Sequence, residues 1–277
     1  MSTPSHLACL LLLASTAISA CGGDAAAGRT ETLILTGSST VAPLATELGV
    51  RFEEQNPTIR VDVQSGGSSR GIADARSGHA QIGMASRALK ASESDLAAET
   101  IARDGVGLIV HASNPLTSLD AEAVRGIYTG KITDWSELGG TPGRITVVNK
   151  AEGRATLAVF LEHFGLESRD VHADVIAGEN EQAIKTIAGT TSSIGYVSIG
   201  TAEIDIEAGI EIKLLALDGV PATTAAVADG SYPMARPLNL VTFGDRTDWA
   251  QRFIDFAHDP KNADLILRES FVPISKP

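Results

Sequence analysis

The chain has 277 residues and a formal net charge of −12 at pH 7, and only 4% of its residues are aromatic. The negative charge argues against nucleic acid or an anionic lipid surface as a partner. The shortage of aromatic rings argues against a site that stacks on sugars, nucleotides or single-stranded nucleic acid.

The N-terminal segment has the pattern of a secretory signal. Residues 1–20 contain no Lys, Arg, Asp or Glu, and an apolar run occupies their middle. Ile18-Ser19-Ala20-Cys21 resembles the bacterial lipobox, in which a peptidase cuts before a cysteine that then carries lipid. We expect a signal peptide at 1–20, lipid on Cys21 and a flexible tether at 21–30. The alternative is a secreted protein cut nearby, with Cys21 free.

Further along, stretches rich in Gly, Ser and Thr lie between strand-like and helix-like runs. A strand that turns into a helix through small residues leaves N–H groups and hydroxyls at the positive end of a helix dipole, where an anion is favoured. Helix capping alone would also explain these hydroxyls. Their repetition predicts an oxyanion site. The stretches are 36–40, 65–71 and 83–87.

Short aliphatic runs alternate with helical patterns along the whole chain, which predicts an α/β fold. Helices are expected from near Thr40, with Pro43 in the first turn, over 121–128 and over 249–257. The expected strands are 32–35, 59–63, 81–84, 106–110, 145–148, 171–176, 194–197, 212–215 and 238–243.

Two turn-prone stretches divide the chain into lobes. Residues 113–116 are typical of an exit from one lobe, and residues 235–237 of a return to it. We therefore expect lobe I to comprise 31–111 and 238–277, and lobe II to comprise 112–237. Thr117 followed by Asp120 fits a capping box for the helix that comes next.

Several of these pieces occur in one order, and together they resemble the phosphate-binding proteins of phosphate ABC transporters, the PstS-like family. This resemblance implies a two-lobed, periplasmic-binding-protein-like (type II) fold with the ligand cleft between the lobes. It also implies a monomer that delivers inorganic phosphate to ABC permease subunits, with no cofactor. The segments that carry it are 36–44, 65–71, 114–117, 127–135 and 194–198.

The resemblance also implies ligand contacts in lobe I. Ser39, Thr40 and Val41 match the first loop of the family, and Ser68 matches the second. Ser86, followed by Arg87, stands where better-known members have an Asp that accepts a hydrogen bond from protonated phosphate. Because a serine can accept or donate, the rejection of fully ionised sulfate is weakened here.

The matching element of lobe II departs further from the family pattern, Arg-x-x-Gly-Ser-Gly-Thr. Lys150 keeps the charge of the Arg position, and Arg154 replaces a Ser. Ala155 and Thr156 complete the implied contacts. Arg154 either directs its guanidinium at the ligand or closes the lobes through a salt bridge.

The function expected from the sequence is capture of inorganic phosphate by a lipid-anchored protein of the periplasm or cell surface. Alternatives are the same fold binding sulfate, molybdate or a phosphonate, a phosphatase or phosphate-sensing protein, and a scaffold that binds no anion. The six His residues show no metal-ligand spacing. The serines lack a placed His and Asp, so we expect no enzyme.

Overall fold

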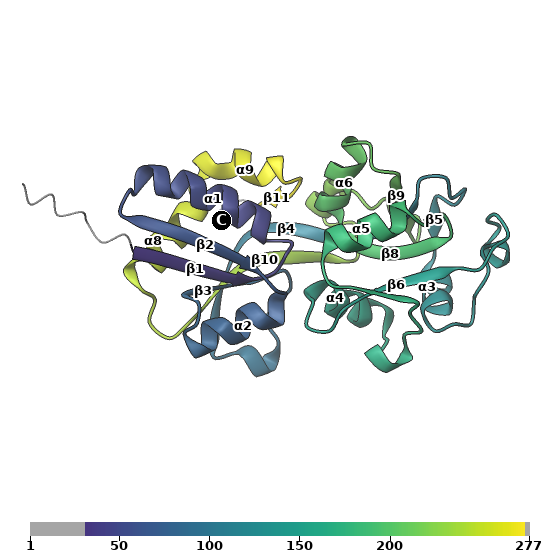
Figure 1. Cartoon of the computed structure of the whole chain (residues 1–277), viewed down its shortest axis with the longest axis horizontal. Helices are drawn as coiled ribbons and strands as arrows, with labels where there is room; N and C mark the ends of the chain where they lie inside the picture. Colours follow the sequence, from purple (N-terminus) through teal and green to yellow (C-terminus); the bar gives the residue numbers. More distant parts are fainter. Residues whose placement is uncertain (1–30, 275–277) are drawn as a thin grey trace, which may run out of the picture.

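The computed structural model describes residues 31–274 and shows two lobes side by side (Figure 1). The predicted signal peptide, the tether and the lipid-bearing Cys21 lie outside the described residues. Strands follow one another in the order β2-β1-β3-β10-β4-β8-β6-β7, so a continuous path of pairing runs through both lobes. The expected α/β class is confirmed.

Lobe I is built on parallel strands joined by helices. β1 (Glu31–Gly37) pairs with β2 (Ile59–Ser65) on one side and with β3 (Ile82–Ala85) on the other. α1 (Ala42–Gln55) follows β1, and α2 (Ser68–Ser77) follows β2. Both helices therefore begin at the same edge of the sheet.

Two long antiparallel strands run from one lobe to the other. They are β4 (Leu96–His111) and β10 (Ala235–Phe243). β4 pairs with β10 over Leu96–Gly105, and from Val106 onward it pairs with strands of lobe II. The chain thus changes lobe within these strands, and the lobe limits at 111/112 and 237/238 remain a prediction.

The remaining elements pack around these strands. Lobe I also contains α8 (Asp248–Ala257), α9 (Ala263–Arg268), β11 (Val272–Pro273) and the short 3-10 helices η1 (Ala91–Glu93) and η4 (Pro260–Asn262). Lobe II contains β5 (Ser118–Leu119), α3 (Ala121–Tyr128), η2 (Trp135–Leu138), β6 (Thr146–Lys150), α4 (Ala155–Phe164), η3 (Ser168–Asp170), β7 (Val175–Ala177), α5 (Asn180–Ala188), β8 (Ser193–Ser198), α6 (Ile199–Glu207), β9 (Ile212–Leu217) and α7 (Thr224–Ala228).

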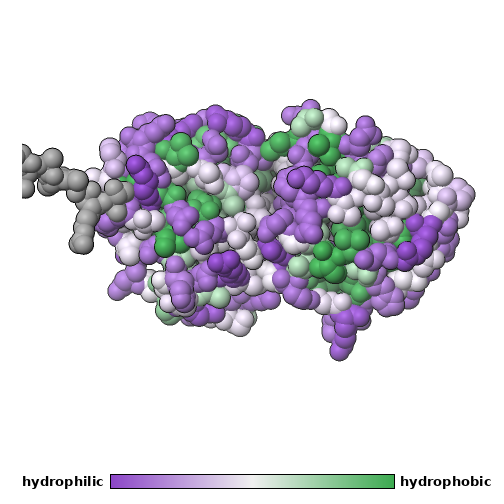
Figure 2. All heavy atoms as spheres, viewed as in Figure 1, coloured by the Kyte–Doolittle hydropathy of each residue, from purple (hydrophilic) through white to green (hydrophobic). Residues whose placement is uncertain are grey.

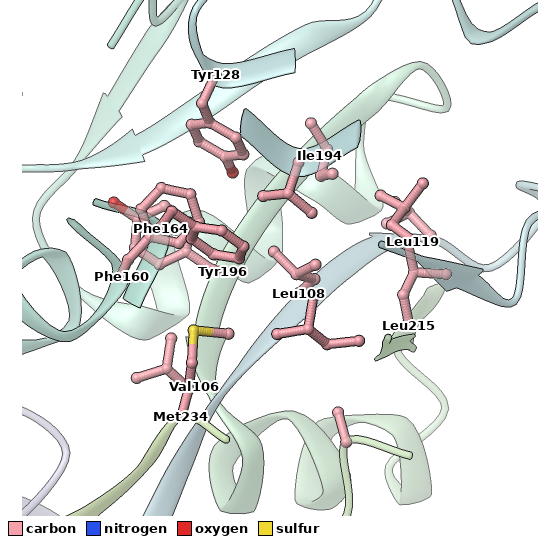
Figure 3. Close-up of a cluster of buried hydrophobic side chains, with 14 of the residues drawn as sticks. Val106, Leu108, Leu119, Tyr128, Phe160, Phe164, Ile194, Tyr196, Leu215 and Met234 are labelled. Carbon is pink, nitrogen blue, oxygen red and sulfur yellow. The ribbon is translucent and has the colours of Figure 1, made fainter. Parts of the chain in front are cut away.

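Aromatic side chains organise the core of each lobe. In lobe I, Phe52 of α1 meets Phe253 of α8 edge to face, with ring centroids 5.3 Å apart. In lobe II, Phe160 stacks on Tyr196 with centroids 4.0 Å apart and planes inclined by 5° (Figure 3). Rings of this size contribute about 1.5–3 kcal/mol each by burial. Each lobe therefore has its own core, into which α1 and α4 pack.

Three local predictions need correction. The strand expected at 106–110 is the second half of β4, because β10 extends its pairing back to Leu96. The strand expected at 171–176 is reduced to β7, since only residues 175–177 pair with β6. Asp120, not a Thr117 capping box, caps α3, and its carboxylate accepts from the N–H of Ala123 at 2.7 Å.

Polar side chains cover much of the face displayed in Figure 2, with smaller apolar areas on both lobes. Within residues 31–274, no helix combines the length and the apolar character that a membrane span requires.

Candidate functional site

Four helix beginnings meet at one small cavity between the lobes. The space that the centre of a water molecule can occupy there is about 10 Å³. The N-terminal ends of α1 and α2 supply one wall, and those of α4 and α5 supply the other. Such ends carry unpaired N–H groups and partial positive charge. The lining residues are Ser38, Ser39, Thr40, Gly67, Ser68, Ser86, Lys150, Arg154, Ala155, Thr156, Gly178 and Asn180.

The first loop contributes hydroxyls held by their neighbours. The Ser38 hydroxyl donates to the Oγ of Ser86 at 2.9 Å and accepts from the N–H of Val41 at 3.3 Å. Thr40 Oγ1 accepts from the Asn180 amide at 3.2 Å, and both side chains are buried. Val41 lies in the core of lobe I and not among the lining residues.

The second loop depends on glycine. Gly67 has φ +94°, which disfavours any other residue, and an added Cβ there would lie 3.0 Å from Cδ of Arg154. Ser68 begins α2, and its Oγ accepts from the N–H of Ser86 at 3.1 Å. The N–H of Ser69 donates to the carbonyl of Gly153 at 3.1 Å. This loop therefore touches the 150–156 segment directly.

In the third loop, 83–87, the side chains of the two predicted site residues, Ser86 and Arg87, point in different directions. Ser86 lines the cavity, whereas Arg87 does not. Both terminal nitrogens of Arg87 donate to the Glu93 carboxylate, at 2.7 and 2.8 Å, in a buried pair. The Arg87 guanidinium holds the pKa of Glu93 below its usual value. This geometry favours a supporting role for Arg87 within lobe I.

On the opposite wall, Arg154 is the N-cap residue of α4 and donates to the Glu179 carboxylate at 2.7 Å. Ala155 and Thr156 open the same helix. The salt bridge of Arg154 is therefore made within lobe II, to the segment before α5, and not across the lobes.

Lys150 ends β6 and is 3% exposed. Its Nζ donates to the carbonyl of Glu179 at 2.8 Å and to Oδ1 of Asn180 at 3.3 Å. Burial, together with the nearby Arg236 charge, lowers the pKa of Lys150 to about 7. The lysine is therefore close to losing its charge at neutral pH.

Arg236 is one of the residues of this region that the sequence did not point to. Its side chain is 1% exposed, and NH1 donates to Oγ of Ser86 at 3.4 Å and to Oγ1 of Thr156 at 3.0 Å. NH2 donates to Oγ1 of Thr40 at 3.1 Å and to the Asp104 carboxylate at 2.8 Å. One guanidinium thus joins hydroxyls from both walls of the cavity. The sequence showed 235–237 only as a return between lobes.

Asn180, the first residue of α5, was missed as well. A signal for it exists, because 177–180 repeats the pattern of the first loops, a short strand followed by a glycine and a helix start. No comparable local pattern distinguishes Arg236, whose partners lie far away in sequence.

The structure brings together most of the predicted site residues. Val41 and Arg87 do not line the cavity. Those that do are Ser39, Thr40, Ser68, Ser86, Lys150, Arg154, Ala155 and Thr156. Among the lining residues, all within the described range 31–274, there is no Asp or Glu. Hydroxyl donors, helix N-termini and cations can hold a small oxyanion there. Ligand contact by each residue remains a prediction.

Comparison with known proteins gives consistent results. The profile of the PBP superfamily domain matches residues 22–261. The phosphate-binding protein PstS of Bacillus subtilis is 28% identical over 262 residues, which cover 93% of this chain and 84% of that protein. PstS of Borreliella burgdorferi is 26% identical, covering 86% of this chain and 88% of its own.

Comparison with solved structures also finds proteins of phosphate transport. A Clostridium perfringens protein, assigned as a phosphate ABC transporter substrate-binding protein and crystallised with bound phosphate, is 31% identical with a TM-score of 0.83. The comparison covers 88% of this chain and 100% of that one. An ABC-type phosphate transport receptor from Vibrio cholerae is 29% identical with a TM-score of 0.73, covering 87% of this chain and 100% of its own.

Proposed function

Since the chain belongs to the PBP superfamily, among the substrate-binding proteins of phosphate ABC transporters, we propose that it captures inorganic phosphate and delivers it to a membrane permease. The observation that carries this proposal is the convergence of four helix beginnings on one cavity, whose lining hydroxyls Arg236 joins. Phosphate is a compact anion with several acceptor oxygens, which suits this density of donors.

Binding and closure of the lobes are one event in this proposal. A ligand favours the closed form only if it interacts better with that form than with the open one. The two walls of the cavity each provide hydroxyl donors: Thr40 and Ser68 on one wall, and Thr156 on the other. A single anion can accept from all three only when the walls come together. The empty protein is then expected to open more readily than the loaded one.

The selectivity of the site among tetrahedral anions is expected to follow from Ser86, which stands where better-known family members have an Asp carboxylate. With Ser86 at the third loop, the lining residues of the described cavity offer no obligate acceptor to repel sulfate. We expect phosphate and arsenate to bind, with weaker discrimination against sulfate than a carboxylate-bearing site would give. Molybdate or a phosphonate as the preferred ligand is the alternative within the same fold.

Isothermal titration of the purified protein with phosphate, arsenate, sulfate, molybdate and methylphosphonate tests the proposal. Phosphate is expected to give the tightest saturable binding. Tighter binding of another anion would change the ligand, and no saturable heat with any of them would overturn the proposal. Absence of hydrolysis of a generic phosphomonoester in the same preparation is expected for a binding protein.

Lipid anchoring through Cys21 is part of the proposal, on the strength of the lipobox-like sequence before it. The expected location is the periplasm or the cell surface, with the protein as a monomer. Expression of the full chain and of Cys21→Ser in a bacterium, followed by detergent-phase partitioning, tests it. The unchanged chain should enter the detergent phase and the variant should not.

A further inference from the structure

Lys150 is a buried amine whose hydrogen-bonding partner atoms are uncharged. Its Nζ donates to a backbone carbonyl, that of Glu179, and to the amide oxygen of Asn180. Within the described residues, no carboxylate lies within salt-bridge distance of this amine. A buried ammonium in such surroundings lacks a counter-charge.

The other charges around Lys150 are largely committed elsewhere. Arg236, on β10, is neutralised by Asp104, its salt-bridge partner at 2.8 Å. Arg154, on α4, is neutralised by Glu179 at 2.7 Å. From beyond salt-bridge distance, Glu179 attracts the amine and Glu181 of α5 does so less strongly. The Tyr196 hydroxyl accepts from the backbone N–H of Lys150. Lys150 therefore decides the net charge of the cavity.

Two features make the charge of this amine adjustable. Burial lowers the pKa of Lys150 to about 7, whereas an arginine would stay protonated. Lys150 also lines the cavity itself, at short range from any anion held there. An anion within about 4–6 Å favours the charged form of a lysine.

We propose that Lys150 takes up a proton as the anion enters the cavity, so that ligand and ammonium form the missing ion pair together. This inference rests on the proposed function, because it assigns a regulation to the same anion site. The step is an acid–base one: the Nζ lone pair accepts a proton, supplied by solvent or by a protonated oxygen of the entering anion. An N–H bond forms at Nζ, and the O–H bond of the donor breaks, leaving its electron pair on the donor oxygen.

The expected consequence is binding that weakens as the solution becomes more alkaline. Below a pH of about 7 the amine is already charged, and above it each binding event must bring a proton. Proton uptake at residue 150 should be about half a proton at pH 7 and about nine-tenths at pH 8. The dissociation constant should rise roughly fivefold between pH 7 and pH 8 from this cause.

Titration with phosphate in buffers of different ionisation enthalpy measures the protons taken up. Lys150→Arg is the matched control, because it keeps the cation but cannot lose it, and phosphate contributes its own protons equally to both proteins. The unchanged protein should take up about half a proton more than Lys150→Arg at pH 7, and about nine-tenths of a proton more at pH 8. Equal uptake by the two proteins at pH 8 would overturn the inference.

A second measurement covers the case in which Lys150→Arg does not bind. In protein labelled at the lysine side chains, the Lys150 signal, assigned by its loss in Lys150→Gln, should titrate near neutral pH without phosphate. With saturating phosphate its midpoint should move up by more than about two pH units. If the signal shows that the Lys150 amine stays charged up to about pH 9 without phosphate, the inference is wrong. Failure of the unchanged protein to bind any anion would instead refute the proposed function.

Discussion

Asp104 and Arg236 face each other across β4 and β10, one residue before the point at which β4 leaves its pairing with β10. Oδ2 of Asp104 accepts from both Nε and NH2 of the guanidinium, at 3.2 and 2.8 Å. The pair is buried, with each side chain 1% exposed. It fixes the arginine where the two lobes meet, so the remaining N–H groups point at the hydroxyls of the cavity.

Replacing this arginine by lysine should weaken binding more than it disturbs folding. Arg236→Lys keeps the charge beside Asp104 but loses the planar fork that reaches both walls. Loss of hydrogen bonds to a charged ligand should reduce phosphate affinity about 10- to 100-fold. Calorimetry gives the affinity, and Arg103→Lys, on the partly exposed neighbour in β4, should stay within about twofold. Unchanged affinity in Arg236→Lys would remove Arg236 from the site.

The hydroxyls at the starts of α1 and α2 should matter for binding. Thr40→Ala and Ser68→Ala should each lower phosphate affinity about tenfold, because each removes a donor to a charged oxygen. Thr40 and Ser68 also accept bonds within the protein, so a loss of about 1 kcal/mol in unfolding free energy is expected.

Controls for these variants lie on the same helices. Thr46→Ala on α1 and Ser77→Ala on α2 remove exposed hydroxyls whose partners are local: the Ala42 carbonyl for Thr46, and the Asp74 carbonyl and the His79 ring for Ser77. Their affinities should match that of the unchanged protein. If all four variants bind phosphate equally, the site lies elsewhere.

We expect closure of the lobes to require the absence of a side chain at Gly67. In Gly67→Ala the new Cβ would lie 3.0 Å from Cδ of Arg154 and 3.1 Å from the carbonyl of Gly153. Overpacking by about 1–3 kcal/mol should weaken phosphate binding between about 5- and 100-fold. Gly78→Ala, with φ +75° at the end of the same helix and nothing near the added carbon, carries the backbone strain alone. An equal effect of the two substitutions on affinity would argue against closure at Gly67.

The Arg87–Glu93 pair should control acid stability and not binding. Because Arg87 lowers the pKa of Glu93, the carboxylate stabilises the fold above its ordinary pKa of 4.5, and this contribution disappears as the pH falls through the lower folded value. Glu93→Gln should lower unfolding free energy by about 3–5 kcal/mol near neutral pH. Urea unfolding should show the difference shrinking below a pH of about 4.5.

Phosphate affinity of Glu93→Gln separates the two interpretations of Arg87. If Arg87 only supports lobe I, affinity should stay within about twofold of the unchanged protein. A large change at constant fold would return Arg87 to the ligand contacts that the family resemblance implied.

Local signals were enough for much of the site. The hydroxyls of 36–40 and 65–71 were identified because capping residues and glycines act over a few neighbouring positions. These features would be the same in any protein that placed a strand before a helix. The segment 150–156 was identified through its resemblance to the family pattern.

By itself, the amino-acid sequence determined the α/β class, the helix beginnings and the family, since each depends on short-range pattern. Only the tertiary structure decided which cation serves the cavity. Arg236 meets Thr156, Ser86 and Thr40 across 80, 150 and 196 residues of chain. It also decided that Arg87 turns to Glu93. Such contacts depend on strand register and on how the two walls meet, and neither leaves a trace in neighbouring residues.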